Sequence, residues 1–337
     1  MENAGLLVND QNKRVYGTAA SASVNSPQQP NRRRKNAGAG SGFCCCIMLC
    51  CPKLKVGAAP VRTYNDFATD EQHAELKKLR AASAVRFDAD RHWPLMERLW
   101  TAVRKAGGVD ADDDVPPPRD QRWKAVGFQS ETPATDFRGG GVLALEHLLH
   151  LAERRPDACR AMGCLASDIF LKVGVGAGAG GAGGAVVDAS AGPPEAYPWA
   201  VCGINVSHVL VCRLQLAAPD VARVCPVPAP SGRAANRRED LRGFAALAAA
   251  TEGGGDAVLA ELFCLAMGVM DARYRRVARE HGARAIMHFQ EPLAAAWEAA
   301  RGWLAEQPEN VAALRARGEA WLSAEREKFS REVASSG

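Results

Sequence analysis

Arg138 is the first residue whose neighbours suggest chemistry, because it lies between Asp136-Phe137 and three consecutive glycines, Gly139 to Gly141. A guanidinium group binds two oxygen atoms at once, which an ammonium group does not do as well. Glycines cost backbone entropy and are kept where a chain turns sharply or is approached closely. Taken alone, these residues leave two interpretations open: Arg138 is presented to another molecule, or it forms a structural ion pair with Asp136.

Other groups of residues are weaker candidates for chemistry. His147 and His150 follow Glu146 at helical spacing, but a transition-metal site needs three or four converging ligands, so we expect no metal. His208 lies in an apolar stretch and is expected to be a hydrogen-bonded core residue. The run GAGAGGAGG lacks the strand and the Lys-Ser/Thr ending of a phosphate-binding loop. Because there is also no nucleophile–base constellation, we expect no independent active site.

The eleven cysteines fall into two groups. Six are scattered singly through apolar stretches, as buried thiols usually are. The other five crowd into the segment FCCCIMLCC, and they are Cys44, Cys45, Cys46, Cys50 and Cys51. This apolar run has nine residues, whereas about 20 are needed to cross a bilayer. Adjacent cysteines with aliphatic and basic neighbours are typical substrates of S-palmitoylation; the alternative is a disordered tail with chance cysteines.

Positive charge is concentrated near the N-terminus. Residues 1–60 contain eight Lys or Arg against Glu2 and Asp10, a net charge of +6, whereas the whole chain carries +4 and its other 277 residues carry −2. The basic residues of this segment would each add about 1 kcal/mol of attraction to an anionic leaflet. No signal peptide is recognisable, so we expect a cytoplasmic protein, peripheral to membranes and held at the membrane surface by this tail. We expect no nucleic-acid partner, because the body of the chain is not basic.

Apolar residues recur at helical spacing along most of the chain. The predicted helices cover residues 69–84, 88–108, 141–154, 157–172, 197–216, 238–250, 255–282, 284–305 and 310–333. No alternating strand of convincing length is present, so the predicted fold class is all-α. Residues 1–62 are predicted to be a disordered, basic and Cys-rich tail, and residues 63–309 a multi-helix domain with a low-complexity linker at 173–194. Residues 310–337 are predicted to be a charged helix that either docks a partner or mainly solvates the end of the domain, and we favour the second role.

The stretch around Arg138 resembles the signature of the ELMO (engulfment and cell motility) domain. The matching positions are Trp123, Gly127, Phe128, Gln129, Pro133, Thr135, Asp136, Phe137, Arg138, Gly139, Gly141, Leu145 and Leu148. The segments Tyr197-Pro198-Trp199 and Gly203-Ile204-Asn205 resemble a second, looser part of the family pattern. The likeness extends from about Phe87 to Leu304 and leaves out the tail and the last helix.

The resemblance implies an all-helical domain that accelerates GTP hydrolysis by small GTPases of the Arf and Arf-like (Arl) families. Arg138 matches the proposed catalytic arginine finger, and the GTPase would supply GTP and Mg²⁺, so no cofactor of the protein's own is implied. Two alternatives stay open. One is a non-catalytic adaptor, such as the larger scaffolds of the Rac pathway, whose armadillo-like repeats and pleckstrin-homology domain this sequence does not show. The other is an effector that binds a GTP-loaded GTPase without accelerating hydrolysis.

The residues around the arginine are expected to support it. Trp123 and Phe128 are expected to be core anchors of the loop. Thr135 and Asp136 are expected to cap backbone amides or to hold Arg138 in position. Gln129 could orient the attacking water, although a buried glutamine bonded to backbone is the commoner arrangement. The glycines after Arg138 are expected to clear the approach of a partner.

Overall fold

The computed structural model describes residues 63–109, 115–165, 197–222, 225–227 and 238–336. Its helices are η1 (Tyr64–Asp66), α1 (Asp70–Ser83), α2 (Ala89–Gly107), η2 (Gln121–Val126), η3 (Pro133–Arg138), α3 (Gly141–Arg154), α4 (Pro156–Ala161), α6 (Trp199–Arg213), α7 (Pro219–Ala222), α9 (Glu239–Ala250), α10 (Gly254–His281), η4 (Gly282–His288), α11 (Gln290–Ala305) and α12 (Val311–Ser336). No strand occurs among the described residues, and the all-α prediction is confirmed. The predicted tail and the 173–194 linker lie outside the described residues.

Several helix ends follow from capping residues in the sequence. The Thr69 side chain accepts a hydrogen bond from the Gln72 amide, and the Gln72 side chain bonds back to Thr69, which forms a capping box at the start of α1. Asp88 accepts a hydrogen bond from the Arg91 amide and caps α2. At the other end of α2, Gly108 takes a left-handed conformation with φ of 76° and stops the helix.

The structure contains the short helices η1 and α7, which were not predicted, and it differs from the predicted elements in three further places. The predicted helix at 157–172 is confirmed only as α4, which ends at Ala161, and residues 166–172 lie outside the described part. The predicted helix at 284–305 is divided into η4 and α11. The two short 3₁₀ helices η2 and η3 were not predicted, because a six-residue segment shows too little of a helical repeat.

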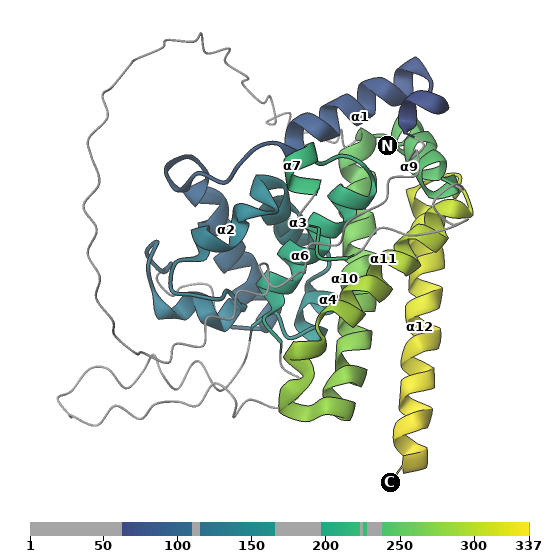
Figure 1. Cartoon of the computed structure of the whole chain (residues 1–337). Coiled ribbons are helices and arrows are strands. Elements are labelled where there is room, and N and C mark those ends of the chain that lie inside the picture. Colours follow the sequence, from purple (N-terminus) through teal and green to yellow (C-terminus); the bar gives the residue numbers. More distant parts are fainter. Residues whose placement is uncertain (1–62, 110–114, 166–196, 223–224, 228–237, 337) are drawn as a thin grey trace, which may run out of the picture. The chain divides into compact units, whose positions relative to one another are not determined.

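Helix α10 is the main support of the core and contacts α3, α6, α9, α11 and α12 (Figure 1). Its central segment from Val258 to Met270 is buried on all sides. Helix α6 is also buried from Trp199 to Val211, as its almost continuous apolar sequence predicts. No described helix is long and apolar enough to span a membrane.

Helix α12 packs closely on α10. Leu314 and Leu322 are buried, and two glycines allow the helices to approach. A Cβ atom on Gly318 would lie 2.6 Å from Leu265 of α10, and a Cβ atom on Gly268 of α10 would lie 2.8 Å from Leu322. The prediction that this helix mainly solvates the end of the domain therefore missed an interhelical face. Only a narrow stripe of α12 is apolar, which makes that face hard to recognise in a charged sequence.

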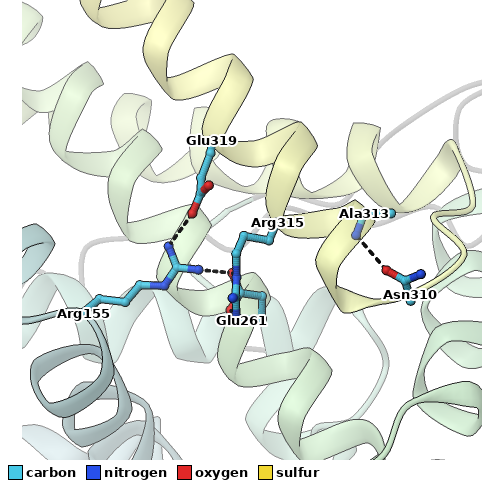
Figure 2. Close-up of polar contacts among 6 residues, drawn as sticks. All are labelled: Arg155, Glu261, Asn310, Ala313, Arg315 and Glu319. Carbon is cyan, nitrogen blue, oxygen red and sulfur yellow. Dashed lines mark hydrogen bonds and ion pairs between the residues drawn. The ribbon is translucent and has the colours of Figure 1, made fainter.

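A buried carboxylate also joins α12 to the body of the domain. The Glu261 side chain in α10 is 3% exposed and binds two arginines (Figure 2). Arg315 of α12 donates to it from Nε at 3.2 Å and from Nη2 at 2.8 Å, and Arg155, between α3 and α4, donates from Nη2 at 2.5 Å. Arg155 also donates to Glu319 of α12 at 3.0 Å. Three parts of the chain thus share one group of charges.

We expect Glu261→Ala to lower the free energy of unfolding by about 2–4 kcal/mol, because it removes the carboxylate that neutralises two partly buried arginines. Chemical denaturation followed by circular dichroism measures this change. Glu298→Ala is the matched control, because its pair with Arg301 is exposed, and it should cost less than about 0.5 kcal/mol. Equal losses for the two variants would contradict the role given to Glu261.

Candidate functional site

The loop that carries Arg138 rests on a cluster of aromatic rings. Trp123 in η2 is fully buried and makes edge contacts with Trp93, Trp100 and Phe128, with ring centroids 5.5–5.9 Å apart. Its Nε1 donates a hydrogen bond to the Pro117 carbonyl at 2.9 Å. The prediction that Trp123 and Phe128 are core anchors is confirmed.

Phe137 continues this cluster to the residue just before Arg138. Its ring stacks on Phe87 at 4.8 Å and contacts Phe128 at 5.8 Å. Pro133 begins η3 and is also buried. Because Phe137 is fixed in the core, the backbone of Arg138 has little freedom to move.

Asp136 connects the two ends of the loop. Its Oδ2 accepts a hydrogen bond from the Gln129 backbone amide at 2.8 Å, so the predicted capping role of Asp136 is confirmed. Thr135 caps the same turn, because its hydroxyl donates to the Thr132 carbonyl at 2.9 Å. Burial raises the pKa of Asp136, while the Gln129 and Thr135 hydrogen bonds and the charge of Arg138 lower it by less.

Arg138 is the last residue of η3, and its side chain is exposed. Within the part of the chain that the structure describes, the Arg138 side chain forms no hydrogen bond and no ion pair. The structural ion pair with Asp136 is therefore not formed; Asp136 is directed to the Gln129 amide instead. Gln129 is exposed as well, so its side chain is not the buried, backbone-bonded glutamine considered above.

Two glycines of the motif are required by contacts inside the molecule. Gly127 has φ of 89°, and a Cβ atom there would lie 2.3 Å from the Trp199 amide nitrogen. Gly141 has φ of 57°, and a Cβ atom there would lie 2.4 Å from the Val85 carbonyl oxygen. The expectation that the glycines after Arg138 only clear a partner's approach thus needs correction at Gly141. The Val142 amide donates to Val85 at 3.0 Å, which also occupies one amide at the start of α3.

Helix α6 contacts the loop at two points, one before Arg138 and one after it. The Gly127 carbonyl accepts a hydrogen bond from the Val201 amide at 3.3 Å, near the start of α6. The Gly139 carbonyl, directly after Arg138, accepts from His208 Nδ1 at 2.9 Å. His208 is 2% exposed and hydrogen-bonded, as predicted for a core histidine. Its partner could not be predicted, because no sequence pattern relates His208 to Gly139.

His147, the first histidine of the weak metal-site candidate, makes contacts inside the core. His147 is buried, its Nδ1 lies 2.9 Å from the Ser207 hydroxyl, and its ring stacks on Phe263. Burial lowers the pKa of His147 to about 3, with a smaller contribution from His150. In the described part of the chain, no three His, Cys, Asp or Glu residues converge as metal ligands would. The cysteines from Cys44 to Cys51 lie outside the described residues.

The fold and this loop define a class: an all-helical domain that presents one arginine from a glycine-bounded turn on an aromatic base. Comparison with known proteins names the family. Residues 75–293, more than half of the chain, match the ELMO/CED-12 family, and the chain belongs to that family.

Individual relatives match shorter segments. ELMO domain-containing protein 1 of Bos taurus is 32% identical over 101 residues, which cover 29% of this chain and 28% of that protein. Human ELMO domain-containing protein 2 is 32% identical over 69 residues, or 20% of this chain and 22% of that protein. Ankyrin repeat and ELMO domain-containing protein D of Dictyostelium discoideum is 33% identical over 70 residues, or 21% of this chain and 5% of that protein. The chain thus spans less than a third of each of these relatives, and no solved structure matches it.

We expect Gly127→Ala and Gly141→Ala to lower the free energy of unfolding by about 3 kcal/mol or more, because each adds a backbone clash to a strained left-handed conformation. Gly108→Ala is the matched control. It also has a positive φ, but no atom lies within 4 Å of the added Cβ, so it should cost only about 1 kcal/mol. Denaturant unfolding measures all three, and a loss for Gly127→Ala no larger than that of Gly108→Ala would contradict the tight backbone contact.

Proposed function

We propose that this protein is a GTPase-activating protein for Arf or Arf-like small GTPases and that Arg138 is its arginine finger. The observation that carries the proposal is the state of Arg138: an exposed, unpaired guanidinium on a backbone held by Phe137, Asp136 and the Gly139 carbonyl. An arginine that serves only as a structural ion pair would be bound to its carboxylate. Membership of the ELMO/CED-12 family and the complete match to its arginine motif support the same assignment.

The chemistry of GTP hydrolysis explains why such an arginine would matter. Negative charge spreads over the transferred phosphoryl group in the transition state, and a small GTPase alone compensates it poorly. A guanidinium supplied by a partner is worth about 10³–10⁵ in rate, or about 4–7 kcal/mol. A rigid loop helps, because the side chain then loses little freedom when it enters the nucleotide site. GTP and Mg²⁺ would come with the GTPase.

We expect Arg138→Ala to abolish stimulated hydrolysis, a loss of about 10³-fold or more, with no loss of stability, because the side chain is exposed. The measurement is single-turnover GTP hydrolysis by a panel of Arf and Arf-like GTPases with the full-length protein. Arg138→Lys should also lose most activity, because lysine cannot bind two phosphoryl oxygens in the same way.

Arg86→Ala is the matched control for the finger. Arg86 is also exposed, and it follows Val85, whose carbonyl contacts the loop at Val142. This variant should keep activity within a few-fold. If wild-type protein binds a GTP-loaded GTPase without accelerating hydrolysis, the effector or adaptor alternative replaces the proposal. Equal losses for Arg86→Ala and Arg138→Ala would indicate a general charge effect.

We also propose that the N-terminal tail attaches the protein to the membrane surface on which its GTPase partner lies. Support comes from the sequence: five clustered cysteines flanked by basic residues, where one acyl chain is marginal and two signals give stable attachment. Since the folded domain is then held near the membrane, encounters with a membrane-bound GTPase would become more frequent.

Replacing Cys44, Cys45, Cys46, Cys50 and Cys51 together by serine should move the protein from the membrane fraction to the soluble fraction of cells. Fractionation with hydroxylamine treatment, which cleaves thioesters, measures the shift. Stimulated hydrolysis in solution should not change, because these residues precede the folded domain. Unchanged fractionation would discard the acyl anchor.

A further inference from the structure

An exposed apolar side chain lies beside the Arg138 loop, on the short segment between α1 and α2. Val85 follows the end of α1 and is 41% exposed. Among the described residues, the other large hydrophobic side chains with such exposure are Met287 at 80% and Val333 at 39%. A single exposed apolar residue is normal on a protein surface, so exposure alone assigns no role to Val85. Its contacts with the arginine loop are what distinguish it.

The backbone of Val85 is joined to the turn that follows Arg138. The Val85 carbonyl accepts a hydrogen bond from the Val142 amide at 3.0 Å. The same carbonyl oxygen would lie 2.4 Å from a Cβ atom on Gly141, a clash that only glycine avoids. The segment that carries Val85 is therefore in direct backbone contact with the chain within four residues of Arg138.

Contacts on both sides of Val85 hold its segment in place. Before it, the Ser83 hydroxyl donates to the Leu216 carbonyl at 2.8 Å, just beyond the end of α6. After it, the Phe87 ring stacks on the Phe137 ring with centroids 4.8 Å apart. Because the backbone is fixed at these two points, a rigid segment presents the Val85 side chain to solvent. An apolar group that is already ordered loses little conformational freedom when a partner covers it.

Val85 and Arg138 lie close enough to share one protein interface. Gly141 is three residues after Arg138, and a chain of that length reaches at most about 11 Å between Cα atoms. The Val85 carbonyl lies against Gly141. A standard interface buries about 800 Å² on each partner, which corresponds to a patch of about 16 Å radius. A protein centred on Arg138 therefore also covers the surface around Val85.

We propose that Val85 is an apolar docking contact for the GTP-loaded small GTPase on which Arg138 acts. The inference rests on the proposed function, because it takes a GTPase as the protein that meets Arg138. The finger acts on charge that develops in the transition state. Since burial of apolar surface is favourable before and during hydrolysis alike, Val85 adds affinity and leaves the chemical step unchanged. The GTPase surface beside its nucleotide site is accordingly expected to present an apolar side chain to Val85.

The chain offers a matched control in Val333, which has the same side chain and nearly the same exposure, 39% against 41%. Val333 lies near the C-terminal end of α12, and this end is far from α1 in Figure 1. A substitution there changes an exposed valine without changing the surface around Arg138.

The test measures binding and catalysis separately with the full-length protein. We expect Val85→Asp to raise the dissociation constant for a GTPase loaded with a non-hydrolysable GTP analogue by about tenfold or more, because the interface would bury an unpaired charge. Val85→Ser, which adds no charge, should raise it by about three- to fivefold. KM for stimulated hydrolysis should rise in parallel, while kcat stays within about twofold of wild type. Val85→Ile and Val333→Asp should leave the dissociation constant near the wild-type value.

Arg138→Ala separates this inference from the proposed function. It should remove stimulated hydrolysis while the GTPase still binds within a few-fold of wild type, which is the reverse of the pattern for Val85→Asp. If wild-type protein binds a GTPase without accelerating hydrolysis, and Val85→Asp weakens that binding, the GTPase-activating function fails and the docking role of Val85 stands.

The docking role is overturned if Val85→Asp and Val85→Ser bind the GTPase as tightly as wild type, or if Val333→Asp weakens binding equally. It is also overturned if wild-type protein self-associates and Val85→Asp makes it monomeric without changing its affinity for the GTPase. The occupant of this surface would then be a second copy of the chain. Denaturant unfolding of each variant checks that these exposed substitutions leave the free energy of unfolding near the wild-type value.

Discussion

The geometry around Arg138 depends on two contacts between backbone segments that leave no room for a Cβ atom. At Gly127 the chain lies against the first amide of α6, and at Gly141 it lies against the Val85 carbonyl. Each contact also requires a positive φ, so glycine is needed for two independent reasons. Because one contact lies before the arginine and the other after it, they fix both ends of the loop. In this arrangement Phe137 is buried in the aromatic cluster and the Arg138 side chain is exposed.

The charges of the loop follow from the same arrangement. A carboxylate two residues from an arginine in an open turn would normally attract it. Here Asp136 is partly buried, and its Oδ2 accepts a hydrogen bond from the Gln129 amide. If the carboxylate turned toward the arginine, that amide would lose its hydrogen-bond partner. The acidic residue therefore stabilises the turn rather than the arginine side chain. This division of roles leaves the exposed Arg138 side chain without an ion-pair partner among the described residues, so its charge is available to attract an anion.

The sequence predicted most helices because their apolar faces are wide and their capping residues are local. Thr69 with Gln72, Asp88 and Gly108 lie within a few residues of the ends they determine. The motif identified the residues of the site but not their contacts, since the partners of Gly127, Gly139 and Gly141 are far away in the chain. The packing of α12 was missed for a related reason: glycine–leucine contacts between helices leave no periodic pattern in either helix.

Helix α6 connects these observations. It contacts the loop before Arg138 through Val201 and after it through His208. A buried helix transmits displacement along its axis because its neighbours are close-packed and leave no room for local adjustment. The loop that presents Arg138 is thus held on both sides of the arginine by contacts with one buried helix.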